Sequence, residues 1–320
     1  MKIIRKLDDI HEKLLNPVVT IGNFDGVHLG HREIFRRVKE SAAEVGGVSV
    51  AITFFPHPLK VVAPDRNFKL ITTYPQKEAL IASSGIDYLI TIPFSREFAG
   101  ISAEDFVKDI LVRRVGVKKI IIGYDYAFGS NREGNVEMLR RLGAEFGFSV
   151  EMLEQIGNGG TPFSSSMVRS LIENGDVQGV VPFLGRYFSV GGKVVHGLHR
   201  GKQLGFPTAN VLPEEELLPK PGVYAVKVCC ADSIHDGACN IGFNPTFNNG
   251  RLTVEVHLHD FEGDLYGREL RIFFVERIRD ERTFSDVNEL CQAIEKDVAA
   301  CREILRGVSL SECCERQAES

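Results

Sequence analysis

The chain has 320 residues, which is long for one domain and comfortable for two. With 43% hydrophobic and 25% charged residues it has the composition of a soluble globular protein, and its net charge of −5 argues against general nucleic-acid binding. No apolar run approaches the ~18 residues of a bilayer span and no C-x-x-C pair indicates a zinc or disulfide framework.

The first half of the chain alternates strand and helix signals. Apolar runs predict strands at residues 18–22, 48–55, 87–92, 117–123 and 148–153. Helices are predicted between them: one with Ile34, Phe35, Val38 and Ala42 at helical spacing, one from Thr73 to Gly85, one from Ser102 to Gly116, and one over 136–146. Such alternation predicts a doubly wound parallel α/β sheet, with ligands beyond the carboxyl ends of its strands.

From about residue 184 the pattern changes to short strand-like runs separated by Gly, Pro and Asn turns. These runs cover residues 187–195, 222–230, 236–243, 252–261 and 269–278, and they predict a small antiparallel β-barrel. An amphipathic helix over 283–305 follows, with Thr283 or Ser285 as its N-cap. We therefore predict two domains of different class, residues 1–183 and 184–307, followed by a disordered tail over 308–320.

The segment GNFDGVHLGH (residues 22–31) follows the first of these strands and carries two histidines. His28 and His31 are three positions apart, so a helical turn would place them on one face, and Gly30 would let a ligand approach the backbone. Donors of this kind suit reaction at the α-phosphate of ATP, because they gain strength as negative charge builds on the transferring group. The alternative is that one histidine caps the helix and the other is a surface residue.

The segment FSSSMVR places three serines at a predicted helix start. Ser164, Ser165 and Ser166 would offer hydroxyl and N–H groups there, and Arg169 would lie in the first turns. Such groups together suit a phosphate. Taken alone, the segment is better explained by N-capping beside a surface arginine.

The glycine-rich segment GLHRGKQLGFPTAN (residues 197–210) ends with two oxygen-bearing side chains. Thr208 and Asn210 are two positions apart, so an extended chain would point both in one direction. Hard oxygen ligands suit Mg²⁺, which takes a few protein oxygens together with substrate phosphates. A hairpin with an Asx-turn at Asn210 is the alternative.

The run LTVEVHLHD alternates apolar and polar residues. Val254 and Val256 would share one face, while Glu255 and His257 would lie on the other. A solvated outer face explains this pattern. The functional interpretation makes Glu255 a general base that deprotonates an alcohol as it attacks a γ-phosphate.

GNFDGVHLGH resembles the G-x-F-D-G-x-H-x-G-H signature of nucleotidylyltransferases related to class I tRNA synthetases. With TFFPHP, GYDYAFGSNREG and SSSMVR, it is similar to the adenylyltransferase module of bacterial bifunctional riboflavin kinase/FAD synthetases. The family often has Ile and then Ser-Ser-Thr where this chain has Phe163 and then three serines, and we expect this difference to be tolerated.

The resemblance implies site residues for this module. ATP and its phosphates would be bound by Gly22, Asn23, Phe24, Asp25, Gly26, His28, His31, Ser164, Ser165, Ser166 and Arg169, of which His28, His31 and Arg169 would act in catalysis. Flavin or nucleotide contacts would come from Asp125, Tyr126 and Phe128.

The second half resembles the riboflavin kinase barrel of the same enzymes. The blocks GKVVHGLHRGKQLGFPTAN, PGVYAV, NIGFNPTF, VEVHLHDFEGDLYG and IRDERTF occur in that order, and the whole resemblance covers about residues 1–305. It implies that Glu255 is the catalytic base and that Thr208 and Asn210 hold Mg²⁺. ATP would also contact Gly191, Lys193, Gly197, Gly205, Pro207, Thr208 and Asn210.

The sequence thus predicts a bifunctional enzyme of flavin cofactor synthesis. Riboflavin would be phosphorylated by ATP with Mg²⁺ to give FMN, and FMN would be adenylylated by a second ATP to give FAD and pyrophosphate. The alternatives are that only one module is active, or that the protein is a flavin-binding carrier or regulator. We expect small-molecule substrates only, with no nucleic-acid or membrane partner. We also expect a cytoplasmic location, because the charged start MKIIRKLDDIHEKLL lacks the apolar core of a signal peptide.

Overall fold

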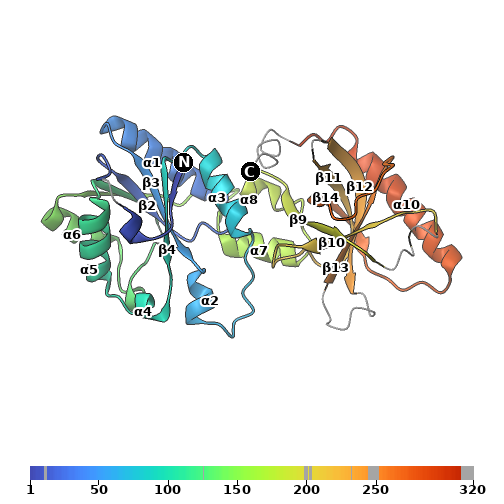
Figure 1. Cartoon of the computed structure of the whole chain (residues 1–320), viewed down its shortest axis with the longest axis horizontal. Helices are drawn as coiled ribbons and strands as arrows, with labels where there is room; N and C mark the ends of the chain where they lie inside the picture. The colour runs from blue at the N-terminus through green and yellow to red at the C-terminus, as the bar shows by residue number, and fades with distance from the viewer. Residues whose placement is uncertain are drawn as a thin grey trace. The chain divides into compact units, whose positions relative to one another are not determined.

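The computed structural model of the chain describes residues 1–10, 13–124, 126–197, 201, 204–231, 233–243 and 252–310. Its contacts divide the chain into two compact units: Met1–Lys69 with Tyr74–Phe163, and Leu70–Thr73 with the chain from Ser164 onward (Figure 1). This division falls earlier than the predicted domain boundary at residues 183 and 184, because Val168 and Ile172 pack in the core of the second unit. Residues 311–320 of the predicted tail lie outside the described residues.

The first unit contains a parallel sheet with strand order β1-β4-β3-β2-β5-β6. Its strands are β1 (Lys2–Ile4), β2 (Val18–Ile21), β3 (Ser49–Phe55), β4 (Tyr88–Pro93), β5 (Lys119–Gly123) and β6 (Ser149–Leu153). Its helices are η1 (Leu7–Asp9), α1 (Leu29–Glu44), α2 (Pro58–Val62), α3 (Tyr74–Ser83), α4 (Arg96–Ala99), α5 (Ala103–Asp105) continuing into η2 (Phe106–Val115), η3 (Ser130–Arg132) and α6 (Val136–Phe146). A small hairpin, β7 (Gly157–Asn158) and β8 (Thr161–Pro162), ends the unit.

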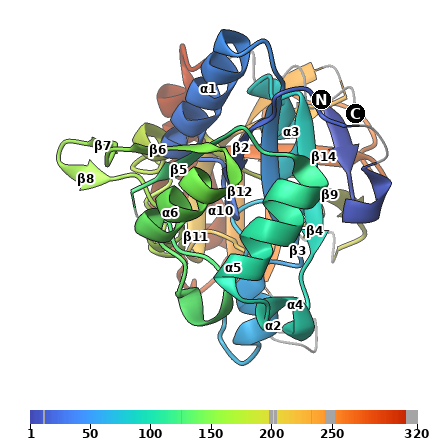
Figure 2. The same cartoon turned by 90° about the vertical axis from the view of Figure 1, so that its left-hand side faces the viewer.

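Both faces of this sheet are buried. Successive residues of β3 enter different cores: Val50 and Ile52 pack with Phe106 and Leu139, whereas Ala51 packs under α1 and α3. Helices α5 and α6 lie on the first face (Figure 2). An uninterrupted apolar strand is what burial on both faces requires, so the predicted doubly wound sheet is confirmed.

The second unit begins with α7 (Ser165–Glu173) and α8 (Val181–Leu184) and continues into a closed antiparallel barrel. Its strands, in the order β10-β13-β12-β11-β14-β9, are β9 (Phe188–Val195), β10 (Ala209–Pro213), β11 (Gly222–Cys230), β12 (Ser233–Phe243), β13 (Leu252–Leu258) and β14 (Glu269–Asp280). Alternate residues, Val254 and Val256 among them, fill the interior. Helix α10 (Val287–Leu305) packs on β11, β12 and β14, so the predicted barrel with a terminal helix is confirmed (Figure 1).

The start of α10 corrects one prediction. Its N-cap is Asp286, whose carboxylate accepts from the Glu289 N–H at 2.9 Å, rather than Thr283 or Ser285. Ser285 instead donates its N–H to the Glu289 side chain at 2.9 Å, which completes a reciprocal cap. Within the described residues, none of the helices combines the length and apolar character that crossing a bilayer requires.

Candidate active sites

The first candidate site lies after the carboxyl end of β2, in residues 22–28, which we call the histidine turn. Its backbone adopts positive φ at Phe24 (50°), Gly26 (77°) and Val27 (39°), a conformation that side-chain-bearing residues rarely take. A Cβ on Gly22 would lie 2.8 Å from the Phe24 ring. The turn is therefore tight, and its Asp25 is buried, with only 4% of its surface exposed.

His28 and His31 lie together at the start of α1. His28 is the N-cap, and its Nδ1 accepts the His31 backbone N–H at 3.3 Å. The two rings stack with centroids 3.6 Å apart, and His31 meets the edge of Phe24 at 5.3 Å. The capping role proposed as the alternative is therefore real for His28, but His31 is not a surface residue.

Burial keeps His31 uncharged before any ligand binds. It lowers the pKa of His31 well below its usual value, and the nearby His28 and Lys77 lower it further. Its Nδ1 is buried and finds no hydrogen-bond partner among the described residues. A neutral imidazole with an unpaired nitrogen fits a site that is completed by a polar ligand.

Lys77, on α3, is part of the same site and was missed from the sequence. Its side chain is only 6% exposed, and its ammonium donates to the Asn23 carbonyl at 3.2 Å and to Thr53 Oγ1 at 3.1 Å. Burial lowers the pKa of Lys77 to about 8. A lysine in a helix is usually solvated, so the sequence carries no signal for this placement.

The aromatic residues predicted to contact flavin or nucleotide follow β5. Tyr126 stacks on Phe128 with centroids 5.6 Å apart, and Phe128 is buried against Phe106. Asp125 lies outside the described residues. Two exposed aromatic side chains at strand ends were missed: Phe55 (50% exposed), the last residue of β3, and Tyr124 (44% exposed), directly after β5. Their signal was an aromatic residue where a parallel strand ends.

The serine segment begins α7, as predicted. Ser164 is the N-cap and its hydroxyl accepts the Met167 N–H at 3.1 Å, while Ser165, Ser166 and Arg169 lie in the first turns. Contacts assign these residues to the second unit. Their role in binding phosphate stays a prediction.

In the second unit, three polar residues form a row across the barrel. Asn210 on β10 pairs with Glu255 on β13, which pairs in turn with Asn240 on β12. Since paired residues point to the same face, this row lies outside the interior that Val254 and Val256 fill. The predicted alternation is confirmed, and Asn240 is a residue that the sequence interpretation missed.

Glu255 and Asn240 line a cavity of about 290 Å³, which we call the helix pocket because α10 closes it. Apolar walls come from Phe206 and Val223 and from a face of α10, with Leu290, Ile294 and Val298 at helical spacing. Arg279 also lines it and holds α10 through Asp297, with Nη2 2.6 Å from Oδ2. A flat apolar ligand with a hydroxyl end fits such a lining.

A second cavity of about 450 Å³, the rim pocket, is lined by residues including Val194, Leu258, Phe261 and Tyr266. Thr208 lines both this pocket and the helix pocket. A group bound in one pocket can therefore meet a group bound in the other at Thr208.

The predicted Mg²⁺ ligands fit a small hard cation. A Cβ on Gly197 would lie 2.2 Å from the Asn210 amide, and one on Gly201 would lie 3.1 Å from Thr208 Oγ1, so glycine is what lets the backbone approach both side chains closely. In the described part of the chain, no group of three or more His, Cys, Asp or Glu could hold a metal ion. Mg²⁺ is commonly held by a few protein oxygens together with the phosphate oxygens of a substrate.

The other residues predicted to contact ATP in the barrel divide into two sets. Pro207 lines the rim pocket, and its carbonyl accepts from His257 Nδ1–H at 2.8 Å, while Gly205 takes a positive φ of 85° just before it. The described lining residues of the two pockets do not include Gly191, Lys193, Gly197, Gly205 or Asn210. The N–H of Gly191 donates to the Glu215 carboxylate at 2.8 Å.

Comparisons with known proteins match both units. The FAD synthetase family matches residues 10–167, and the riboflavin kinase family matches residues 184–305. The bifunctional riboflavin kinase/FMN adenylyltransferase of Escherichia coli (strain K12) is 36% identical over 305 residues, 95% of this chain and 97% of that protein. The protein of the same name from Bacillus subtilis (strain 168) is 36% identical over 294 residues, covering 90% and 92% of the two chains.

A solved structure matches along nearly the whole chain. The crystal structure of a protein described as a macrolide-efflux protein from Streptococcus pneumoniae superposes with a TM-score of 0.86 at 30% identity, covering 96% of this chain and 99% of that one. The family matches and the identity over nearly the full length of both chains agree with the resemblance that the motifs carry. The chain belongs to the family of bifunctional riboflavin kinase/FMN adenylyltransferases.

Proposed function

We propose that the barrel phosphorylates riboflavin with ATP to give FMN, and that Glu255 is its general base. The row of Asn210, Glu255 and Asn240 carries this proposal, because it sets a carboxylate beside a predicted metal ligand on the wall of an apolar cavity. The helix pocket would take the flavin ring and the rim pocket the nucleotide. Thr208, which lines both, would lie where the two substrates meet.

The chemistry follows from these positions. The oxygen of the ribityl 5′-hydroxyl attacks the γ-phosphate of ATP while Glu255 accepts the proton of that hydroxyl. ADP is the leaving group. Thr208 and Asn210 would hold Mg²⁺. When bound, the ion supplies positive charge to the phosphate oxygens. Arg279 holds α10 through Asp297 and so keeps the apolar wall in place around the flavin.

The first unit would join FMN to AMP from a second ATP, releasing pyrophosphate. The attacking group is already an anionic phosphate and needs no general base, so positioning and charge stabilisation supply the rate. His28 and His31 would donate to the phosphates from the histidine turn. The resemblance of the serine segment to the same family also gives Ser164, Ser165 and Arg169 a role in phosphate binding. The buried Nδ1 of His31, for which the described residues offer no hydrogen-bond partner, supports this role.

The enzyme would act in the cytoplasm on small molecules, with riboflavin, FMN and ATP as substrates and Mg²⁺ as the metal. A time course of products from riboflavin, ATP and Mg²⁺, followed by chromatography, tests the proposal. We expect FMN first and FAD later, with ADP equal to the sum of FMN and FAD, and pyrophosphate equal to FAD. Accumulation of FMN without FAD would favour a single active module, and no product would favour a flavin carrier.

A further inference from the structure

Lys77 is a buried cation beneath the histidine turn. It lies on α3, is only 6% exposed, and both of its hydrogen bonds, to the Asn23 carbonyl and Thr53 Oγ1, go to neutral oxygens. The Tyr74 ring lies 5.2 Å from its ammonium. Burying an ammonium whose hydrogen bonds go to neutral oxygens lowers the stability of the folded chain. A purely structural role therefore does not account well for a lysine at this position.

Lys77 holds the histidine turn at Asn23, the residue before the first positive φ of the turn. The Asn23 carbonyl accepts from Lys77 at 3.2 Å and from Thr53 Oγ1 at 3.2 Å, so α3 and β3 both hold the same peptide group. The next residue, Phe24, has a positive φ of 50° and packs against His31 at 5.3 Å. A shift at Asn23 would therefore move the ring that positions His31.

Lys77 also sets the charge of this site. His31 is influenced by His28 and by Lys77, and both disfavour its protonated form. Around Lys77, Asp25 of the turn and Glu78 of α3 favour the charged ammonium, while burial opposes it. Because two imidazoles stacked at 3.6 Å cannot both be charged cheaply, a fixed cation on α3 can supply positive charge without protonating either ring.

We propose that Lys77 is a positioning residue for adenylyl transfer, which holds the histidine turn, and with it the His31 ring, in place for the triphosphate. The proposal rests on the proposed function of the first unit. It adds a residue from α3 to the histidine and serine motifs.

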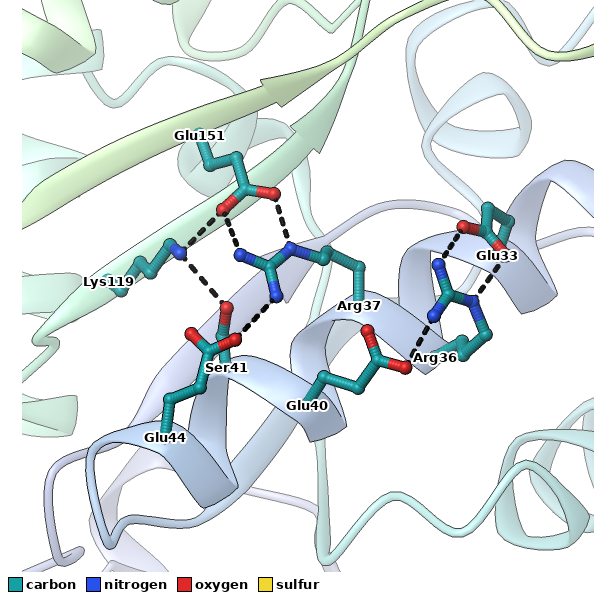
Figure 3. Close-up of polar contacts among 8 residues, drawn as sticks. All are labelled: Glu33, Arg36, Arg37, Glu40, Ser41, Glu44, Lys119 and Glu151. Atoms are coloured by element: carbon teal, nitrogen blue, oxygen red, sulfur yellow. Dashed lines mark hydrogen bonds and ion pairs between the residues drawn. The ribbon is translucent and has the colours of Figure 1, made fainter.

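The test uses the full chain with two substitutions at Lys77 and one matched control. Lys77→Met removes the charge at similar volume, and Lys77→Arg retains a cation. The control is Lys119→Met at the start of β5, where the ammonium donates to Ser41 at 2.9 Å and pairs with Glu151 at 2.5 Å (Figure 3). Lys119 is also largely buried, with 18% of its side chain exposed, but it lies at the opposite end of its parallel strand from the edge with the histidine turn.

The first measurement is the ring titration of His31 by NMR without ATP, with a His31→Gln variant to assign the signal. We expect the pKa of His31 to rise in Lys77→Met and to stay unchanged in Lys119→Met, with both amide spectra remaining folded. A titration of His31 that is the same in wild type and Lys77→Met overturns the proposal. If Lys77→Met does not fold, a pH profile of Lys77→Arg that matches wild type overturns it as well.

The second measurement is kcat/KM for ATP in adenylylation of supplied FMN against pH. Wild type should lose activity above about pH 8, as Lys77 loses its proton, and Lys77→Arg should move that decline to higher pH. Lys77→Met should lose about 10²-fold, the effect of misplacing a reacting group by about 1 Å. Unchanged adenylylation in Lys77→Met overturns the proposal. Failure of the proposed function itself would appear separately, as full adenylylation by variants of His28 and His31.

Discussion

Asn210 and Glu255 stand directly opposite each other on adjacent strands of the barrel. The pairing of β10 with β13 sets this register, and paired side chains have Cβ atoms about 4.5–5.5 Å apart. The register therefore brings a predicted Mg²⁺ ligand and the proposed base to one place, although residues 210 and 255 are 45 positions apart in the sequence. The strand register thus places Asn210, which would hold the metal, next to Glu255, which would take the proton.

The Mg²⁺ assignment predicts a selective defect in Thr208→Ala. Loss of the hydroxyl should raise the Mg²⁺ concentration needed for FMN formation by about 10–100-fold, the usual range when a group that supports a metal is removed. Thr208→Ser keeps the oxygen and should restore most of the activity. Titrating Mg²⁺ in the riboflavin phosphorylation assay checks this, and equal requirements in the alanine variant and wild type would contradict it.

The histidine pair predicts a split between the two activities. His28→Ala with His31→Ala should abolish FAD formation while FMN still accumulates from riboflavin. Since His28 also caps α1, its loss removes about 0.5–2 kcal/mol of stability. His28→Asn is the matched control, because it retains a capping oxygen and lacks the imidazole. FAD production near the wild-type rate in the double variant would exclude the phosphate-binding role.

Arg169 should not tolerate replacement by lysine. An ammonium cannot reproduce the planar two-pronged contact of a guanidinium with phosphate, so Arg169→Lys should cost about 1.5–3 kcal/mol in kcat/KM for ATP during adenylylation. Riboflavin phosphorylation in the same preparation serves as the control. Wild-type adenylylation kinetics in this variant would remove Arg169 from the site.

Glu215 predicts a pH dependence of stability. Its carboxylate accepts from Arg271 at 2.6 Å and from the Gly191 N–H at 2.8 Å, yet burial outweighs both and raises its pKa from 4.5 to about 7. Between these values the unfolded chain releases a proton that the folded chain retains. The free energy of unfolding should therefore fall as pH rises from 4.5 to 7, by at most about 1.4 kcal/mol per pH unit from this group.

The matched variant for this effect is Glu215→Gln, which cannot ionise. The unfolding free energy of Glu215→Gln should lack this slope. The unfolding free energy of wild type minus that of Glu215→Gln should therefore be larger at pH 5 than at pH 7. Denaturant unfolding at the two pH values measures it. A difference that stays constant or grows toward pH 7 would show that Glu215 is ionised throughout.

Much of the fold could be predicted because the strands of the two units differ in their pattern of apolar and polar residues. The apolar run Ile120–Ile122 is uninterrupted since both faces of its strand are buried, and 252–258 alternates since only one face fills the barrel interior. β10 was missed because ANVLP is short, ends in proline and follows a glycine-rich segment. The cap of α10 was misplaced because Thr283, Ser285 and Asp286 are all capable of the bond.

The sites were predictable only where chemistry is concentrated in a short motif. His28 and His31 stand in one segment, and the structure brings their rings into contact. Lys77 and Asn240 reach their sites through a helix packing and a strand register, neither of which leaves a local signal. Arg279 was visible only as a basic residue within IRDERTF, and its bond to Asp297 depends on where α10 lies.

The central claim, that Glu255 is the base for riboflavin phosphorylation, is tested most directly by Glu255→Gln with two substrates. The substitution keeps size but removes the ability to accept a proton at neutral pH. We expect FMN formation from riboflavin to fall by about 10²–10⁴-fold, the usual contribution of a general base, while adenylylation of supplied FMN continues at the wild-type rate. Phosphorylation of riboflavin at the wild-type rate by Glu255→Gln would contradict the assignment and leave Glu255 as a solvated strand residue.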